Sequence, residues 1–173
     1  MKSIIVLGMH RSATSMTARS IHQNKEVYMG EKLLLGHADN PKGHYEDVNF
    51  LKLNIKILNA VKGDWKRPPS RESILKVGHL FDEEIKELIK KSENKAKSLG
   101  MISWGFKDPR TILTIDLYMK HLKNPQFICC YRNHLDVAKS LHKRDGIPLK
   151  DGIQLSKIYN NRLSMFMQNW LNK

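Results

Sequence analysis

The chain has 173 residues, a formal net charge of +13 and a pI near 9.8. This length corresponds to about one domain with a substantial core, so we expect one domain over residues 1–173. The charge favours an anionic ligand or partner, although part of the lysine excess is expected to be solvated surface. No apolar run approaches the ~18 residues of a membrane span, and the first one is too short for a signal peptide.

The two cysteines, Cys129 and Cys130, are adjacent and lie in an apolar run. Their spacing excludes a disulfide framework and gives no zinc motif. We expect them to be small core residues of a cytoplasmic protein, kept reduced.

The first elements predict an anion site. Residues 4–7 are apolar and mostly β-branched, which predicts a buried strand, and residues 14–22 predict a helix. In the small-residue turn between them, N–H groups of the first helical turn face the loop, where the helix dipole adds positive potential. Arg11 adds a planar fork of donors suited to phosphate or sulfate oxygens. Three hydroxyls add further donors: Ser12, Thr14 and Ser15.

Strands and helices alternate along the rest of the chain. This alternation predicts an α/β fold, a three-layer sandwich with a central parallel sheet flanked by helices. We expect a short strand or extended segment at 26–30, a loop at 33–46, strands at 101–106 and 126–131, and helices at 48–62, 82–99, 111–122, around 135–141 and at 151–171. Asp47 is predicted to cap the helix at 48, and Gly63 to take its C′ position.

A basic residue follows each of three predicted strands: Arg11, Lys107 and Arg132. Ligands of an open α/β sheet bind beyond the carboxyl ends of its strands. We therefore expect the three side chains to converge on one crevice. Acidic residues and histidines crowd residues 37–47 as well, but without metal-ligand spacing, so we expect no metal site.

The segment Gly8-Met9-His10-Arg11-Ser12-Ala13-Thr14-Ser15 resembles the 5′-phosphosulfate-binding loop of sulfotransferases. These enzymes use 3′-phosphoadenosine 5′-phosphosulfate (PAPS) as sulfuryl donor. The family usually has glycine where this chain has Ala13, and the loop has no Walker lysine, which disfavours a P-loop nucleotide kinase or ATPase. An ordinary strand–turn–helix connection is the alternative. The resemblance implies donor binding by His10, Arg11, Ser12, Ala13, Thr14 and Ser15.

Residues 131–141 resemble the 3′-phosphate-binding segment of the same family, in which an arginine ends a strand and a serine follows on the next helix. By this resemblance Arg132 and Ser140 hold the 3′-phosphate of PAPS. The strand-to-helix turn must then fold back, so that both side chains reach one phosphate. A structural salt bridge of Arg132 is the alternative.

Residues 105–110, Gly-Phe-Lys-Asp-Pro-Arg, resemble the strand end that places catalytic groups in bacterial-type members. By this resemblance, Lys107 and Arg11 would neutralise the negative charge that builds on the bridging oxygen of PAPS as the sulfuryl group leaves. Alternatively, Lys107 pairs with Asp108 and shapes the turn.

The acceptor also needs a base. Glu46, in a segment resembling a loop of the bacterial-type branch, and Glu31, placed as in protein-tyrosine sulfotransferases, are equally favoured over Asp108 and His44. Either glutamate is alternatively a surface carboxylate.

Together the resemblances cover residues 4–145 and imply a P-loop NTPase-like sulfotransferase fold. They imply sulfuryl transfer from PAPS to a hydroxyl or amine of a small-molecule or carbohydrate acceptor, without a metal. The family usually continues past the last long helix, so we expect the C-terminal part of its domain to be absent from residues 1–173. A non-catalytic basic module binding nucleotides or nucleic acid is the alternative, but the few aromatics do not interleave with basic residues as stacking platforms do, so nucleic acid is disfavoured.

Overall fold

The computed structural model describes residues 1–34, 36 and 43–172. Its sheet has the strand order β2-β3-β1-β4 with every pairing parallel, which confirms the predicted α/β fold. Val6 of β1 lies opposite Lys107 of β3, and Gly8 of β1 lies opposite Cys130 of β4. Three strands therefore end at one edge. The strands are β1 (Lys2–Gly8), β2 (Val27–Tyr28), β3 (Ser103–Lys107) and β4 (Pro125–Cys130).

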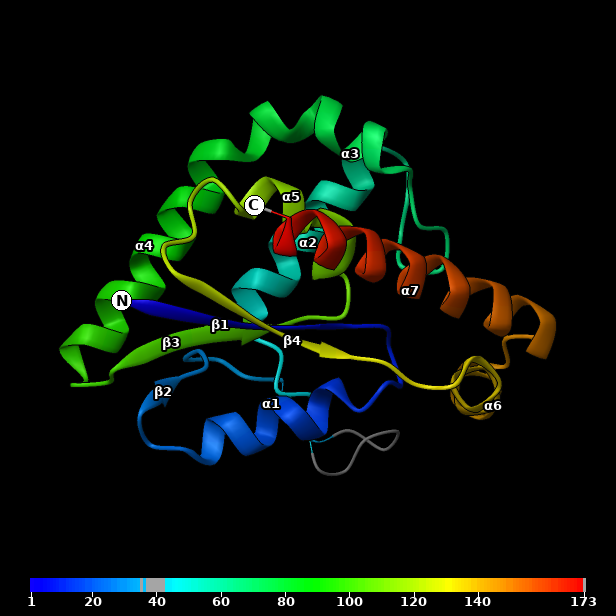
Figure 1. The fold of residues 1–173 in the computed structure, drawn as a ribbon, viewed down its shortest axis with the longest axis horizontal. Helices are drawn as coiled ribbons and strands as arrows, with labels where there is room; N and C mark the ends of the chain where they lie inside the picture. The colour runs from blue at the N-terminus through cyan, green and yellow to red at the C-terminus, as the bar shows by residue number, and fades with distance from the viewer. Residues whose placement is uncertain (35, 37–42, 173) are drawn as a thin grey trace.

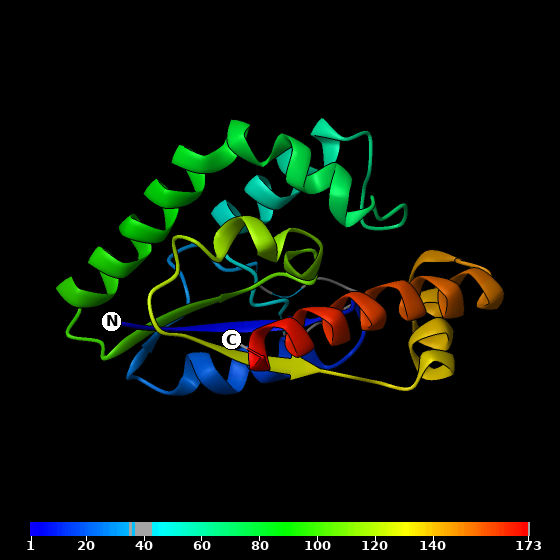
Figure 2. The same cartoon turned by 45° about the horizontal axis from the view of Figure 1, so that its top comes forward.

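Helices cover both faces of this sheet. Figures 1 and 2 show α1 on one face and α2, α4 and α5 on the other, while α6 lies beyond the end of β4. The helices are α1 (Thr14–Gln23), α2 (Val48–Ala60), α3 (Arg71–Val77), α4 (Asp82–Ser98), α5 (Thr111–Tyr118), α6 (His134–Asp145) and α7 (Leu149–Leu171), with a 3₁₀ turn at Gly78–Phe81. In the described part of the chain, none of them is both long and apolar enough to cross a bilayer.

The ends of α2 show one confirmed and one corrected prediction. Asp47 caps the helix, because its Oδ1 accepts hydrogen bonds from the backbone N–H groups of Asn49 at 2.8 Å and Phe50 at 3.3 Å. At the other end, Lys62 rather than Gly63 takes the left-handed conformation, with φ of 56°. Gly63 is needed for space, since a Cβ there would lie 2.9 Å from the Pro69 ring.

An aromatic stack joins α2 to the sheet. The rings of Phe50 and Phe106 are stacked with centroids 3.8 Å apart, and Trp104 and Tyr118 pack around them. All four side chains are buried. The stack fixes α2 against β3, so the buried Asn54, one turn after Phe50, lies against the segment that leaves β3.

The cysteines differ from the prediction. Both are free thiols on the edge strand β4 and are only partly buried, because β4 is covered less completely than β1 and β3. Burial still raises the pKa of the Cys129 thiol to about 11.

Candidate active site

A pocket of about 220 Å³ opens at the sheet edge where β1, β3 and β4 end. Arg11, Lys107 and Arg132 all line it, although they are far apart in the sequence. The three basic residues predicted to converge therefore do so. The rest of the lining comes from the β1–α1 loop with the start of α1, the segment before α2, the β3–α5 connection and α6: His10, Ala13, Thr14, Ser15, Met16, His44, Glu46, Pro109 and Arg144.

The β1–α1 loop is tightly wound. Arg11 and Ala13 both adopt left-handed backbone conformations, with φ of 66° and 65°. The hydroxyl of Ser12 is buried and has no hydrogen-bond partner within the described residues, and the same holds for Nε2 of His10. Buried polar groups are normally paired, so these two atoms leave bonding capacity beside the pocket.

Replacing Ala13 by glycine is expected to raise the free energy of unfolding by about 0.5–1 kcal/mol, because glycine adopts positive φ without the Cβ clash and is also the better N-cap of α1. Urea unfolding monitored by circular dichroism measures the change. Ala60→Gly, in the last turn of α2, is the control and is expected to destabilise the protein. Equal losses in both variants would contradict strain at Ala13.

Arg132 and Ser140 both reach the loop. The guanidinium of Arg132 is exposed and donates to the backbone carbonyl of Arg11 at 2.9 Å. Ser140, on α6, accepts a hydrogen bond from Nε of Arg11 at 2.7 Å. The connection from β4 to α6 thus folds back as an anion held by both side chains requires. Within the described residues, the observed partner of Arg132 is a carbonyl and not the carboxylate of a buried salt bridge.

Lys107 is almost completely buried, with 1 % of its surface exposed. Its Nζ donates to the Ser15 hydroxyl at 3.1 Å, the His44 carbonyl at 2.9 Å and Oε1 of Glu46 at 2.8 Å. An ammonium has three N–H groups, so all of them are used. Lys107 therefore ties the anion loop to the segment that precedes α2, and its ion-pair partner is Glu46 rather than the alternative Asp108.

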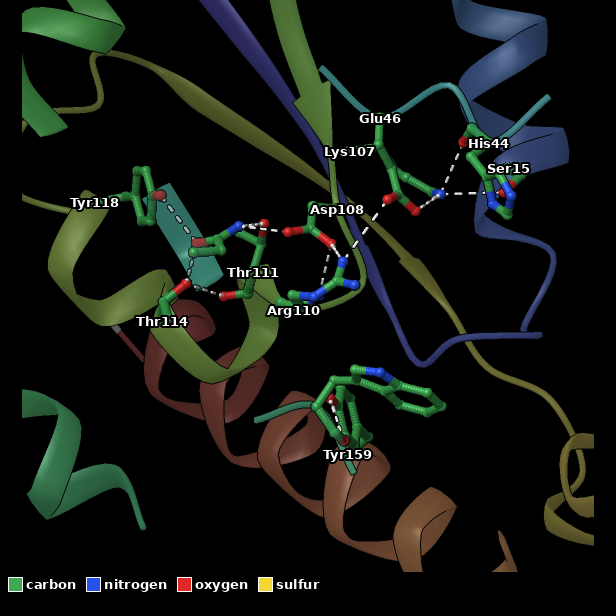
Figure 3. Close-up of polar contacts among 12 residues, drawn as sticks. Ser15, His44, Glu46, Lys107, Asp108, Arg110, Thr111, Thr114, Tyr118 and Tyr159 are labelled. Atoms are coloured by element: carbon green, nitrogen blue, oxygen red, sulfur yellow. Dashed lines mark hydrogen bonds and ion pairs between the residues drawn. The ribbon is translucent and has the colours of Figure 1, made fainter. Parts of the chain in front are cut away.

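A second ion pair lies beside the first, as Figure 3 shows. Nη1 of Arg110 is 2.7 Å from Oδ1 of Asp108 and 3.7 Å from Oε2 of Glu46. Burial raises the pKa of Asp108, Arg110 opposes this shift and the neighbouring Glu46 adds to it. Two cations and two carboxylates thus alternate from the pocket wall inward, in the order Lys107, Glu46, Arg110, Asp108.

His10 lies between aromatic rings and cations. Its ring centroid is 4.5 Å from that of Trp65 and 6.4 Å from that of Tyr159. Burial lowers its pKa well below 6.5, and the positive charges of Arg110 and Arg144 add to the effect. His10 is therefore a neutral imidazole at pH 7.

This lowered pKa makes the stability depend on pH. Below about pH 6.5 the unfolded chain takes up a proton that folded His10 does not, so the free energy of unfolding is expected to fall with decreasing pH, by at most about 1.4 kcal/mol per unit. Urea unfolding between pH 5 and 8 measures the slope. His10→Gln, which cannot titrate, is expected to flatten this slope. An unchanged slope would contradict a lowered pKa of His10.

Glu31 is not brought to this pocket. Its exposed carboxylate is 3.8 Å from Nζ of Lys95 on α4, and it lines another cavity, of about 660 Å³. Glu46 thus lines this pocket, and Glu31 does not. His37 and Asp39, two of the residues crowded near Glu46, lie outside the described residues, and the described ones contain no group of three or more side chains able to hold a metal.

Three residues of the site were missed or not weighed from sequence. Arg144 lines the pocket and lies over the Trp65 ring at 5.4 Å; a basic residue in the last turn of a helix reads as ordinary capping. Arg110 belongs to the 105–110 motif, but its pairing with both Asp108 and Glu46 depends on the fold. Asn54 interrupts the apolar face of α2, and a lone amide on a buried face is the signal that could have found it.

Comparisons with known proteins add one finding. No curated protein and no solved structure matches the chain. The sequence profile of the sulfotransferase family, however, matches residues 3–172, and the parallel sheet with helices on both faces is consistent with the P-loop-like fold of that family. The chain therefore belongs to the sulfotransferase family, whose members are enzymes that transfer sulfate.

Proposed function

We propose that the protein transfers a sulfuryl group from PAPS to a hydroxyl or amine of a small-molecule or carbohydrate acceptor. The observation that carries this proposal is the convergence of Arg11, Lys107 and Arg132, from the ends of three strands, on one pocket. Arginine forks and hydroxyls are the donors that phosphate and sulfate oxygens prefer. The unpartnered, buried Ser12 hydroxyl fits an anion at the loop, since it is a donor still to be satisfied.

The donor would be held at two places. Arg11, the loop N–H groups and the hydroxyls of Ser12, Thr14 and Ser15 would bind the 5′-phosphosulfate, with Ala13 and His10 shaping the loop. Arg132 and Ser140, which meet at Arg11, would bind the 3′-phosphate. When bound, PAPS supplies the activated sulfuryl group.

The chain itself contributes charge and a proton acceptor. Lys107 and Arg11 place positive charge at the pocket, and one N–H of Lys107 becomes available if its bond to Ser15 is exchanged for a bond to the ligand. Among the described residues that line the pocket, Glu46 is the carboxylate, and it would accept the proton of the acceptor hydroxyl. Arg110 and Lys107 hold its two oxygens in place.

The experiment that tests this proposal incubates the protein with PAPS and a panel of sugars and phenols, and measures formation of 3′-phosphoadenosine 5′-phosphate. Glu46→Gln is expected to lower kcat about 100-fold, because the base is lost while the donor site remains. Glu31→Gln removes the other candidate carboxylate and is expected to keep the wild-type rate. A normal rate for Glu46→Gln, or an equal loss for both variants, would contradict the assignment.

A further inference from the structure

The polar network behind the pocket extends to α2. Asn54 is completely buried and uses its whole hydrogen-bonding capacity. Its Nδ2 donates to Oδ2 of Asp108 at 2.9 Å and to the Thr111 hydroxyl at 3.0 Å. Its Oδ1 accepts from the hydroxyls of Thr114 at 2.7 Å and Tyr118 at 2.9 Å. Figure 3 shows these contacts continuing from Tyr118 to the Lys107 side of the pocket.

Asp108 is the member of this network whose protonation state depends most on its surroundings. It has no solvent contact, and burial favours its neutral form. Its oxygens are held by the amide of Asn54, and by the N–H and guanidinium of Arg110 at 3.2 Å and 2.7 Å. The titratable or charged groups around it are Arg110 and Lys107 from its own segment, Glu46 from the segment before α2, Tyr118 from α5 and Tyr159 from α7. His10, from the β1–α1 loop, faces Arg110 and Lys107.

We infer that Asn54 is a positioning residue of the active site. By donating a hydrogen bond to Asp108 it keeps that carboxylate charged. The charged Asp108 in turn holds the Arg110 guanidinium in a position where it also pairs with Glu46. Asn54 does not line the pocket. It acts through Arg110, whose Nη1 lies between the two carboxylates.

The order of the charges links Asn54 to Glu46. If Asp108 takes a proton, Arg110 loses its nearest counter-charge and is drawn to Glu46, which already pairs with Lys107. A carboxylate that faces two full cations is a poorer proton acceptor. The effect on transfer rests on the proposed function, whereas the effect on Asp108 itself does not.

The test compares substitutions at two buried positions, Asn54→Asp and Tyr118→Phe. Asn54→Asp places a second carboxyl against Asp108, so the pair must share a proton in the folded state. Tyr118→Phe removes one hydrogen bond to the same amide but leaves the bond to Asp108. The unfolded chain ionises both carboxyls above about pH 4 while the folded pair resists, so the Tm deficit of Asn54→Asp is expected to widen from pH 5 to pH 8. That of Tyr118→Phe is expected to stay constant.

The exchange variant Asn54→Asp/Asp108→Asn restores one amide and one carboxylate. This variant is expected to recover the wild-type Tm, and its Tm deficit is no longer expected to widen with pH. It is not expected to recover kcat, because Arg110 then faces an amide. If Asn54→Asp does not fold, Asp108→Asn alone replaces it, since this variant imitates a permanently neutral Asp108.

Two readouts separate this inference from the proposed function. For an active enzyme, Asn54→Asp or Asp108→Asn is expected to lower kcat about 100-fold with donor binding unchanged, while Tyr118→Phe keeps most of its activity. If the wild type transfers no sulfate, the proposed function fails, and the Tm series still decides the role of Asn54. Parallel Tm curves for Asn54→Asp and Tyr118→Phe, or equal losses of kcat, would show a purely structural amide and overturn the inference.

Discussion

Replacing Lys107 by methionine is expected to lower the free energy of unfolding by about 3–5 kcal/mol and to abolish sulfate transfer. The side chain is almost completely buried, and its ammonium makes three hydrogen bonds, one of them to the buried Glu46. Methionine fills a similar volume but leaves Glu46 without its nearest cation. The segment that precedes α2 also loses its tie to the anion loop.

Urea unfolding and the transfer assay measure these two effects. Lys139→Met removes a positive charge from an exposed position of α6, and is expected to change stability little. Lys107→Met/Glu46→Gln removes both charges of the pair, so it is expected to be more stable than the sum of the single losses predicts. Additive losses in the double variant would contradict a coupled ion pair.

Replacing Arg132 by alanine is expected to weaken binding of 3′-phosphoadenosine 5′-phosphate by about 10-fold or more, since a charge-assisted bond to phosphate is worth about 1.5–3 kcal/mol. The side chain is exposed and its observed bond is to a carbonyl, so the fold is expected to be unaffected. Calorimetric titration measures the dissociation constants.

The control for Arg132→Ala is Lys150→Ala, which removes the same charge from an exposed position of α7 outside the pocket. It is expected to bind the nucleotide nearly as the wild type does. Equal weakening in both variants would mean that net charge alone, and not the position of Arg132, attracts the ligand.

The sheet and the pocket cations could be predicted because they depend on local patterns. β1, β3 and β4 each contain a short apolar run with a basic residue at or just beyond its end, and parallel strands place those residues at one edge. The short helix α3 was missed because seven residues show little periodicity, although its cap, where Ser70 accepts from the N–H of Ser73 at 3.1 Å, is a recognisable signal. Residues 111–122 were predicted as one helix, but α5 ends at Tyr118 and is buried on almost every side.

The pairings inside the site could not be predicted. Lys107 and Glu46 are 61 residues apart, and the sequence offered Asp108, the next residue, as an equally reasonable partner for the lysine. Glu31 and Glu46 were equally favoured from sequence, whereas in the structure the bonds of Lys107 to the His44 carbonyl and to Glu46 hold the second at the pocket. The strain at Arg11 and Ala13 is likewise a property of the folded loop.

The measurement that most directly tests the donor site compares 3′-phosphoadenosine 5′-phosphate with adenosine 5′-phosphate in calorimetric titrations of the wild type. The two nucleotides differ only in the 3′-phosphate assigned to Arg132 and Ser140. We expect one site per chain, with micromolar affinity, or about 8 kcal/mol, for the bisphosphate and at least about tenfold weaker binding of the monophosphate. Equal affinities, or no binding of the bisphosphate by the folded protein, would contradict the assignment of this pocket to PAPS.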